Sequence, residues 1–135
     1  MSPDRKPPGS PADWLARAQS NLSRANQPKP DDVFWEDLCF DAQQAAEKAL
    51  KALLIKKGIA FRFVHDIGEL ISLLKKASID IPKNVLDSVE LTEFAVEARY
   101  PGPFEAVTEE EATRSIALAA AVVEWVTDKL SDKRI

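Results

Sequence analysis

The chain has 135 residues, of which 45% are hydrophobic and 30% are charged, and its net charge at pH 7 is −4. This length and composition predict one globular domain with a sizeable core, and they are not typical of a disordered protein. The acidic balance argues against a chain-wide electrostatic grip on nucleic acid but leaves room for a local basic patch.

The sequence shows no sign of a membrane or export segment. No apolar run approaches the roughly 20 residues of a membrane-spanning helix, and residues 1–10 lack the apolar core of a secretory signal. Cys39 is the single cysteine, so it has no partner for an internal disulfide, which fits a reducing compartment. We therefore expect a cytoplasmic protein that does not associate with a membrane.

Residues 1–10 carry proline, glycine and serine with little apolar material, and we expect a disordered N-terminal tail there. The domain would then span residues 11–135. Its first helix is predicted over residues 11–25, with Ser10 as N-cap and Pro11 at the first helical position. Apolar residues recur at three- and four-residue steps along it: Trp14, Leu15, Ala18, Leu22 and Ala25.

The second helix, over residues 32–57, has the clearest pattern. Asp31 or Asp32 can cap it, and Gly58 is a natural stop. Its main apolar stripe consists of Phe34, Leu38, Ala42, Ala45, Ala49 and Leu53. Glu47 and Lys51 are four residues apart, in the favourable order for an ion pair on the helix surface.

Three more helices are predicted from caps and breakers. One follows Asp66, and another runs from near Pro82 to about Arg99 with an apolar stripe at 4-3-4-3 spacing, before Pro101-Gly102-Pro103 ends it. Its stripe consists of Val85, Val89, Thr92 and Val96, followed by Arg99. The last helix opens at Thr108, where Glu111 completes a capping box.

The last helix carries two apolar lines. The first contains Ala112, Ile116, Ala119, Val123, Val126 and Leu130, and the second contains Leu118, Val122 and Trp125. Such a helix contacts neighbours on both faces, either as a central helix of one bundle or with one face against a second subunit. The predicted fold is all-α, an antiparallel up-and-down bundle of about five helices around a four-helix core.

Several segments resemble the HEPN family in their order and spacing. They are WLARAQSNLSRA (14–25), DLCFDAQQAAEKALKALLIKKG (37–58), HDIGELISLL (65–74) and LTEFAVEARYPG (91–102). The resemblance covers nearly all of residues 12–130. It implies a helical bundle that pairs into a two-fold dimer.

The resemblance also implies candidate activities. Many HEPN proteins are encoded beside a small nucleotidyltransferase and act with it, some as toxin–antitoxin pairs. Others are ribonucleases that use an arginine followed after a short interval by a histidine at the dimer cleft. Here the arginine would be Arg99, but no histidine follows it, and His65 is the only histidine of the chain.

Arg99 and Tyr100 are the first candidate ligand-binding residues. Arg99 continues the stripe of its predicted helix, so it is expected to point toward a neighbour and could bind a phosphate. Tyr100 could stack on a base. The structural alternative is that Arg99 bonds the free carbonyls at the helix end and Tyr100 holds the turn.

A polar edge of the second helix supplies the other candidates, Gln44, Lys48 and Lys51, with Gln43 and Glu47 on the adjoining edge. The alternative interpretation of this edge is an ordinary solvated helix face. His65 is expected to be a structural residue beside a helix cap, and Cys39 a buried, inert thiol. No spacing of His, Cys, Asp or Glu predicts a metal site, and no cofactor motif is present.

These observations favour a dimeric module without catalysis of its own. It would bind a nucleotide or RNA, or act with a nucleotidyltransferase-like protein. Two alternatives stay open: a ribonuclease toxin that uses Arg99 with another group, and a purely structural helical dimer.

Overall fold

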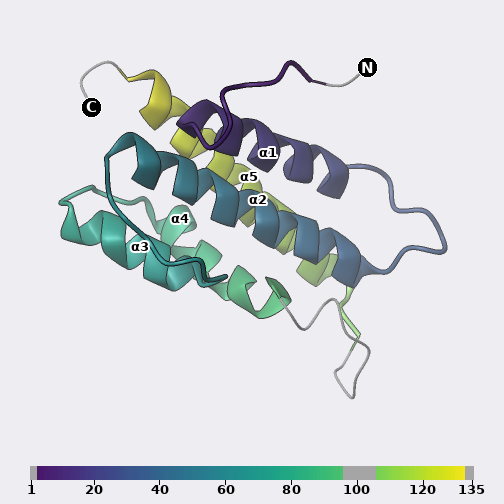
Figure 1. Cartoon of the computed structure of the whole chain (residues 1–135). Helices are drawn as coiled ribbons and strands as arrows, with labels where there is room; N and C mark the ends of the chain where they lie inside the picture. The colour runs from purple at the N-terminus through teal and green to yellow at the C-terminus, as the bar shows by residue number, and fades with distance from the viewer. Residues whose placement is uncertain (1–2, 96–105, 133–135) are drawn as a thin grey trace.

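The computed structural model describes residues 3–95 and 106–132, which form a helical bundle without a β-strand (Figure 1). The elements are α1 (Pro11–Ala25), α2 (Trp35–Lys56), α3 (Ile67–Lys76), α4 (Lys83–Asp87), the 3₁₀ segment η1 (Ser88–Ala95) and α5 (Glu109–Ser131). The predicted all-α fold is confirmed. Residues 3–9, within the expected tail, are exposed and belong to no helix.

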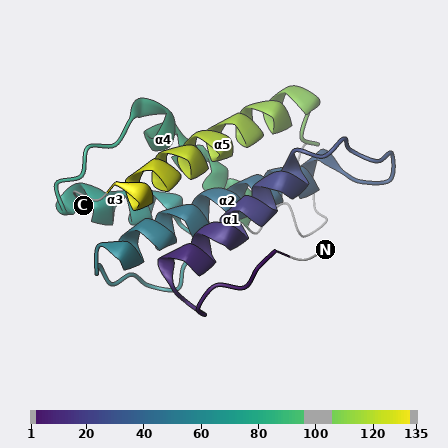
Figure 2. The ribbon, with the colours of Figure 1, turned by 90° about the horizontal axis from the view of Figure 1, so that it is seen from above.

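Helix α2 lies at the centre of the bundle. It packs against α1 and α5, and also against α3 and η1. The colour gradients in Figures 1 and 2 show that α1 runs opposite to α2, whereas α5 runs in the same direction as α2. The reversal from α1 to α2 is the one expected of an up-and-down bundle. Residues 57–66, called the strap below, lead from the end of α2 to the start of α3.

The central position of α2 follows from its sequence. Ala52, Leu53 and Leu54 are consecutive residues, so they point in directions about 100° apart around the helix, and none of them has exposed surface. Small alanines let neighbouring helices approach closely, and each fully buried leucine contributes about 1.5–3 kcal/mol through removal of apolar surface from water. Because α2 is surrounded by other elements of the bundle, its charged and amide side chains lie close to residues of those elements.

Three predicted helix starts are confirmed by their caps. The side chains of Ser10, Asp66 and Thr108 each accept a hydrogen bond from a backbone N–H three residues later, at 3.1, 3.2 and 3.1 Å respectively. The predicted start of α2 is wrong. The helix begins at Trp35, where the Asp37 carboxylate accepts the N–H of Phe34 at 3.4 Å, so neither aspartate of the preceding loop caps it.

The prediction of one continuous helix over residues 82–99 is also wrong. The α-helix ends at Asp87 and the chain continues as a 3₁₀ helix to Ala95, which has three residues per turn instead of 3.6. The buried residues accordingly recur every three positions: Val85, Ser88, Leu91 and Phe94. Val89, predicted to face inward, is 46% exposed. Residues 96–99 lie outside the described residues.

Most residues in both apolar lines of α5 are buried by the same chain. Ala119 and Val126 of the first line and Val122 of the second have no exposed surface, and Leu118 is nearly as buried. The two-sided pattern therefore fits a helix packed within one bundle, and a second subunit is not needed to explain it. None of the helices in the described part of the chain is long and apolar enough to cross a membrane.

Candidate functional site

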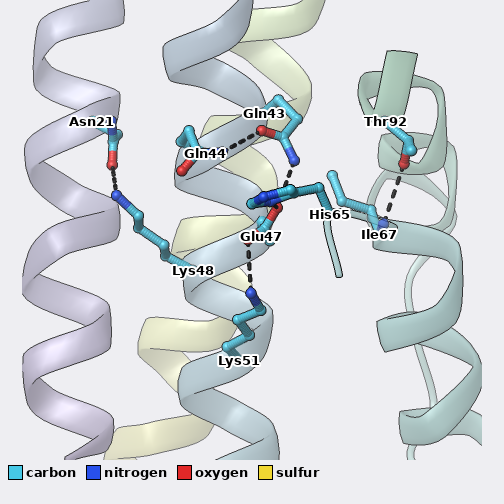
Figure 3. Close-up of polar contacts among 9 residues, drawn as sticks. All are labelled: Asn21, Gln43, Gln44, Glu47, Lys48, Lys51, His65, Ile67 and Thr92. Carbon is cyan, nitrogen blue, oxygen red and sulfur yellow. Dashed lines mark hydrogen bonds and ion pairs between the residues drawn. The ribbon is translucent and has the colours of Figure 1, made fainter. Parts of the chain in front are cut away.

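The structure describes only part of the predicted binding residues. Arg99 and Tyr100 lie outside the described residues. Gln44, Lys48 and Lys51 all lie on α2, and Figure 3 shows this polar edge between α1 on one side and His65 of the strap on the other. The site is therefore built from α2 outward to these two neighbours.

A buried carboxylate, that of Glu47, organises the centre of this edge. Its Oε1 accepts hydrogen bonds from Nε2 of Gln43 at 2.8 Å and from Nδ1 of His65 at 2.9 Å (Figure 3). Its Oε2 accepts from Nζ of Lys51 at 2.8 Å. Gln43, Glu47, Lys51 and His65 are called the Glu47 cluster below. They bring together two turns of α2 and a residue 18 positions farther along the chain.

The three donors keep Glu47 ionised in spite of its burial. Burial alone would raise the pKa of this carboxyl, because a low-dielectric surrounding disfavours the charged form. The hydrogen bonds from Lys51, His65 and Gln43 outweigh that effect and hold the pKa below its ordinary value. Glu47 is therefore an anion at neutral pH, with its charge directed at Lys51 and the imidazole.

Lys51 is buried, and its ammonium is committed to Glu47. The ammonium also lies 5.6 Å from the ring centre of Trp14 on α1 and 5.7 Å from that of Phe61 on the strap, within the range of cation–π attraction. The predicted ion pair is present, but it is not on the surface. The interpretation of this edge as a solvated face is wrong for Gln43, Glu47 and Lys51, which are all buried.

His65 is the residue that sequence reasoning missed as part of a site. Its side chain is 59% exposed although Nδ1 contacts a buried carboxylate. The strap carries it to α2, and α3 begins two residues later, where Thr92 of η1 accepts the N–H of Ile67 at 3.2 Å. A single histidine in a sequence does not indicate which residue its side chain will contact in the fold. The available signal was Glu47, a charged residue that lies among Ala45, Ala46 and Ala49 of α2.

Lys48 points to the other side of α2, toward α1 (Figure 3). Its Nζ donates to Oδ1 of Asn21 at 2.8 Å, and Asn21 donates in turn to the carboxylate of Asp41 at 3.1 Å. Burial lowers the pKa of Lys48, and the charges of Arg17 and Arg24 lower it further, while Glu47 and Asp41 oppose the shift. Lys48 is thus a half-buried cation held by an amide instead of a carboxylate.

Gln44 lies beside the Glu47 cluster and contacts it through Gln43. It is partly exposed, and its Nε2 donates to Oε1 of Gln43 at 2.7 Å. Of the three α2 residues predicted to bind a ligand, Gln44 and Lys48 therefore keep part of their surface open. The third, Lys51, is buried and forms an ion pair with Glu47, so it can affect a ligand only by holding that carboxylate in place.

The described residues offer neither a reactive thiol nor a metal-binding cluster. Cys39 is buried as predicted, and its burial raises the pKa of the thiol to about 11, so it is a thiol and not a thiolate at neutral pH. Residues 3–95 and 106–132 contain no group of three or more His, Cys, Asp or Glu side chains able to hold a metal ion. The arrangement offers an oriented imidazole, an amide and a half-buried ammonium, which are groups that bind anions.

Comparison with known proteins identifies relatives over nearly the whole chain. The HEPN domain family profile matches residues 11–130. The structure resembles that of TT1696 from Thermus thermophilus, with 30% sequence identity and a TM-score of 0.77 over 88% of this chain and 97% of that one. No curated protein matches the sequence.

Two further solved structures are similar. An archaeal HEPN homologue is 29% identical, with a TM-score of 0.70 over 90% of this chain and 98% of that chain. A HEPN domain protein from Thermotoga maritima is 23% identical, with a TM-score of 0.54 over 90% of this chain and 93% of that chain, a likeness that concerns the fold alone.

Proposed function

The chain belongs to the HEPN domain family, and from that premise we propose that it is a homodimeric binding module for a nucleotide or RNA. In this proposal it performs no catalysis of its own, and it acts with a nucleotidyltransferase-like protein partner. The binding part of the proposal rests on a specific arrangement of side chains. The dimer and the protein partner are carried over from the family resemblance.

The observation that carries the proposal is the exposed imidazole of His65 on a buried carboxylate. Because Nδ1 donates to Glu47, the ring is fixed in orientation, and a ligand would meet Nε2. A protonated imidazole donates from Nε2 to a phosphate oxygen while Glu47 stabilises its charge through Nδ1. A histidine that served only to tie the strap to α2 would not need this exposure.

The other proposed ligand contacts surround this imidazole. Gln44 and Lys48 lie on the adjoining part of α2, where an amide and an ammonium suit a phosphate or a sugar hydroxyl. Arg99 and Tyr100 are proposed to contribute a guanidinium for a second phosphate and a ring for a base. Lys51 would act indirectly, through its ion pair with Glu47.

The absence of catalysis is proposed from the sequence around Arg99. No histidine follows Arg99, and the single histidine of the chain is tied to Glu47 on α2. The arginine–histidine pair that the family's ribonucleases use is therefore incomplete within one chain. Binding without cleavage remains the simplest activity for this set of groups.

The central experiment measures nucleotide binding by thermal shift and by titration with ATP, GTP and UTP. A nucleotide that prefers the folded state raises the melting temperature, by an amount that grows with its concentration relative to Kd. His65→Asn is the informative variant, because the asparagine amide can still donate to Glu47 from the position of Nδ1 but has no group at the position of Nε2. We expect its stability to be kept and its nucleotide affinity to fall at least about tenfold, the weight of one charge-assisted hydrogen bond.

Lys83→Ala is the matched control, since it removes an exposed cation from an ion pair on α4. It should leave the affinity unchanged. Equal affinity of His65→Asn and wild type would remove His65 from the site. If wild-type protein shows no thermal shift with any nucleotide and retains no RNA, the binding proposal fails as a whole.

Catalysis and assembly are tested separately. Incubation with single-stranded and structured RNA should leave the RNA intact, and cleavage that disappears in Arg99→Ala would instead establish the ribonuclease alternative. Sedimentation equilibrium should give twice the monomer mass. Mixing with the nucleotidyltransferase-like product of a neighbouring gene should produce one joint peak on size exclusion, and two independent peaks would contradict the partnership.

A further inference from the structure

The strap presents an aromatic ring that residues 3–95 and 106–132 leave almost uncovered. Phe63 is 91% exposed, and its ring meets that of Phe61 edge-on, with ring centres 6.4 Å apart and an interplanar angle of 73°. Phe61 is partly buried and flanks the ammonium of Lys51. The Phe63 ring is therefore supported from the side, while its surface stays open to solvent.

Basic groups accompany this ring. The end of α2 and the strap contain Lys56, Lys57, Arg62 and His65, and their one acidic residue, Asp66, caps α3. The guanidinium of Arg62 is exposed and paired with Glu69 of α3, and the imidazole of His65 is exposed two residues after Phe63. An open ring with a guanidinium and an imidazole close to it in the chain gives a base a surface on which to stack and its phosphates groups that donate hydrogen bonds.

We propose that the strap is a stacking platform for single-stranded RNA, with Phe63 against a base and His65 against the adjoining phosphate. This inference rests on the proposed nucleotide or RNA binding and specifies its ligand as a strand with bases. Phe63 supplies base contact that does not depend on sequence, because every base offers a π-face. His65 and Arg62 supply the part of the affinity that depends on salt.

A groove beside the ring gives a strand room to continue. It has a volume of about 620 Å³ and lies along the strap and α3, where it is lined by Ala60, Phe61, Arg62, Glu69, Ser72, Leu73 and Lys76. Phe61 belongs both to the groove and to the ring pair with Phe63. Arg62 is paired with Glu69 in this groove, and Lys76 adds a further positive charge, which favours a polyanion over an apolar protein segment and extends the platform beyond one nucleotide.

The test measures fluorescence anisotropy with two labelled probes at a fixed salt concentration. One probe is a short oligoadenylate RNA, and the other is an abasic chain with the same number of phosphates. We expect Phe63→Ala to weaken binding of the oligoadenylate at least about fivefold and to leave the abasic chain unaffected, because stacking acts only on a base. Phe63→Trp should retain the affinity, and His65→Asn should weaken both probes.

Phe34→Ala is the matched control, because Phe34 is the same residue type, 71% exposed, and precedes α2 instead of lying on the strap. It should bind both probes as wild type does. Since Phe63 is almost fully exposed, Phe63→Ala is expected to fold, which circular dichroism checks. Wild-type affinity in Phe63→Ala, with nucleotide binding intact, would overturn the platform alone.

Two other outcomes separate the hypotheses further. If the wild-type protein binds neither RNA nor nucleotides, the proposed function fails and the platform fails with it. If Phe63→Ala lowers self-association at equal protein concentration while the RNA affinity stays the same, the ring belongs to a protein interface. That result would also overturn the platform, but it would leave the nucleotide proposal standing.

Discussion

Glu47–Lys51 on α2 and Lys83–Asp87 on α4 are both lysine–carboxylate ion pairs that span one helical turn. Their N–O distances are similar, at 2.8 and 3.1 Å. The side chains of the first pair are 3–5% exposed, whereas that of Lys83 is 86% exposed. Local spacing produced both pairs, but only burial by other elements decides what each contributes to stability.

The difference lies in the groups around each pair. Glu47 also accepts hydrogen bonds from Gln43 and His65, and Lys51 faces two aromatic rings. Among the described residues, no buried side-chain nitrogen or oxygen lacks a hydrogen-bond partner. A charge taken out of water is tolerated only with such compensation. The buried pair therefore depends on all its partners, whereas water can replace either partner of the exposed pair.

The largest predicted effect is that of Glu47→Gln. The substitution keeps the side-chain volume but leaves the buried ammonium of Lys51 without an opposite charge. We expect the free energy of unfolding to fall by about 3–5 kcal/mol, the cost of removing one member of a buried pair. Urea denaturation followed by circular dichroism measures it.

The double variant Glu47→Leu with Lys51→Met is the control for that prediction. It replaces both charges by apolar side chains of similar size, so it should be more stable than Glu47→Gln. Gln43 would still lose a hydrogen-bond acceptor, which makes the expected recovery partial. A loss below about 1 kcal/mol in Glu47→Gln would show that water reaches Lys51 and that the two pairs are energetically alike.

An intermediate effect is expected in acid. The pKa of Glu47 is lower in the folded state than its ordinary value of 4.5, so the unfolded chain takes up a proton first as the pH falls. The contribution of Glu47 to stability is therefore present above pH 4.5 and is lost as the pH falls through the lowered folded-state pKa. Urea midpoints between neutral and acid pH should drop more for wild type than for the double variant without the pair. Parallel curves would show that Glu47 is not the titrating group.

The caps of α1, α3 and α5 could be predicted from the sequence because they are local. Ser10, Asp66 and Thr108 bond to N–H groups three residues away, so short motifs identify them. The change from α4 to η1 was not predicted, although the sequence contains a pattern that indicates it. Val85, Ser88, Leu91 and Phe94 follow a three-residue period that competes with the four-three pattern through Val89.

The candidate site could be predicted only in part. The polar edge of α2 was identified from helical spacing, and Lys48 and Gln44 do keep exposed surface there. The contact of His65 with Glu47 joins residues 18 positions apart through the path of the strap, which no periodic pattern encodes. Burial of Lys51 likewise depends on Trp14 from α1 and Phe61 from the strap, which meet only in the folded bundle.

The smallest predicted effect is that of Lys83→Met, which removes one member of the exposed pair. Asp87 can be solvated in its place, and the order of lysine before aspartate is the less favourable one with respect to the helix dipole. We expect the free energy of unfolding to change by at most about 0.5 kcal/mol, and raised salt to diminish even that change. Urea denaturation at low and high salt measures both. A loss near that of Glu47→Gln would mean that helical spacing, and not burial, sets the strength of these pairs.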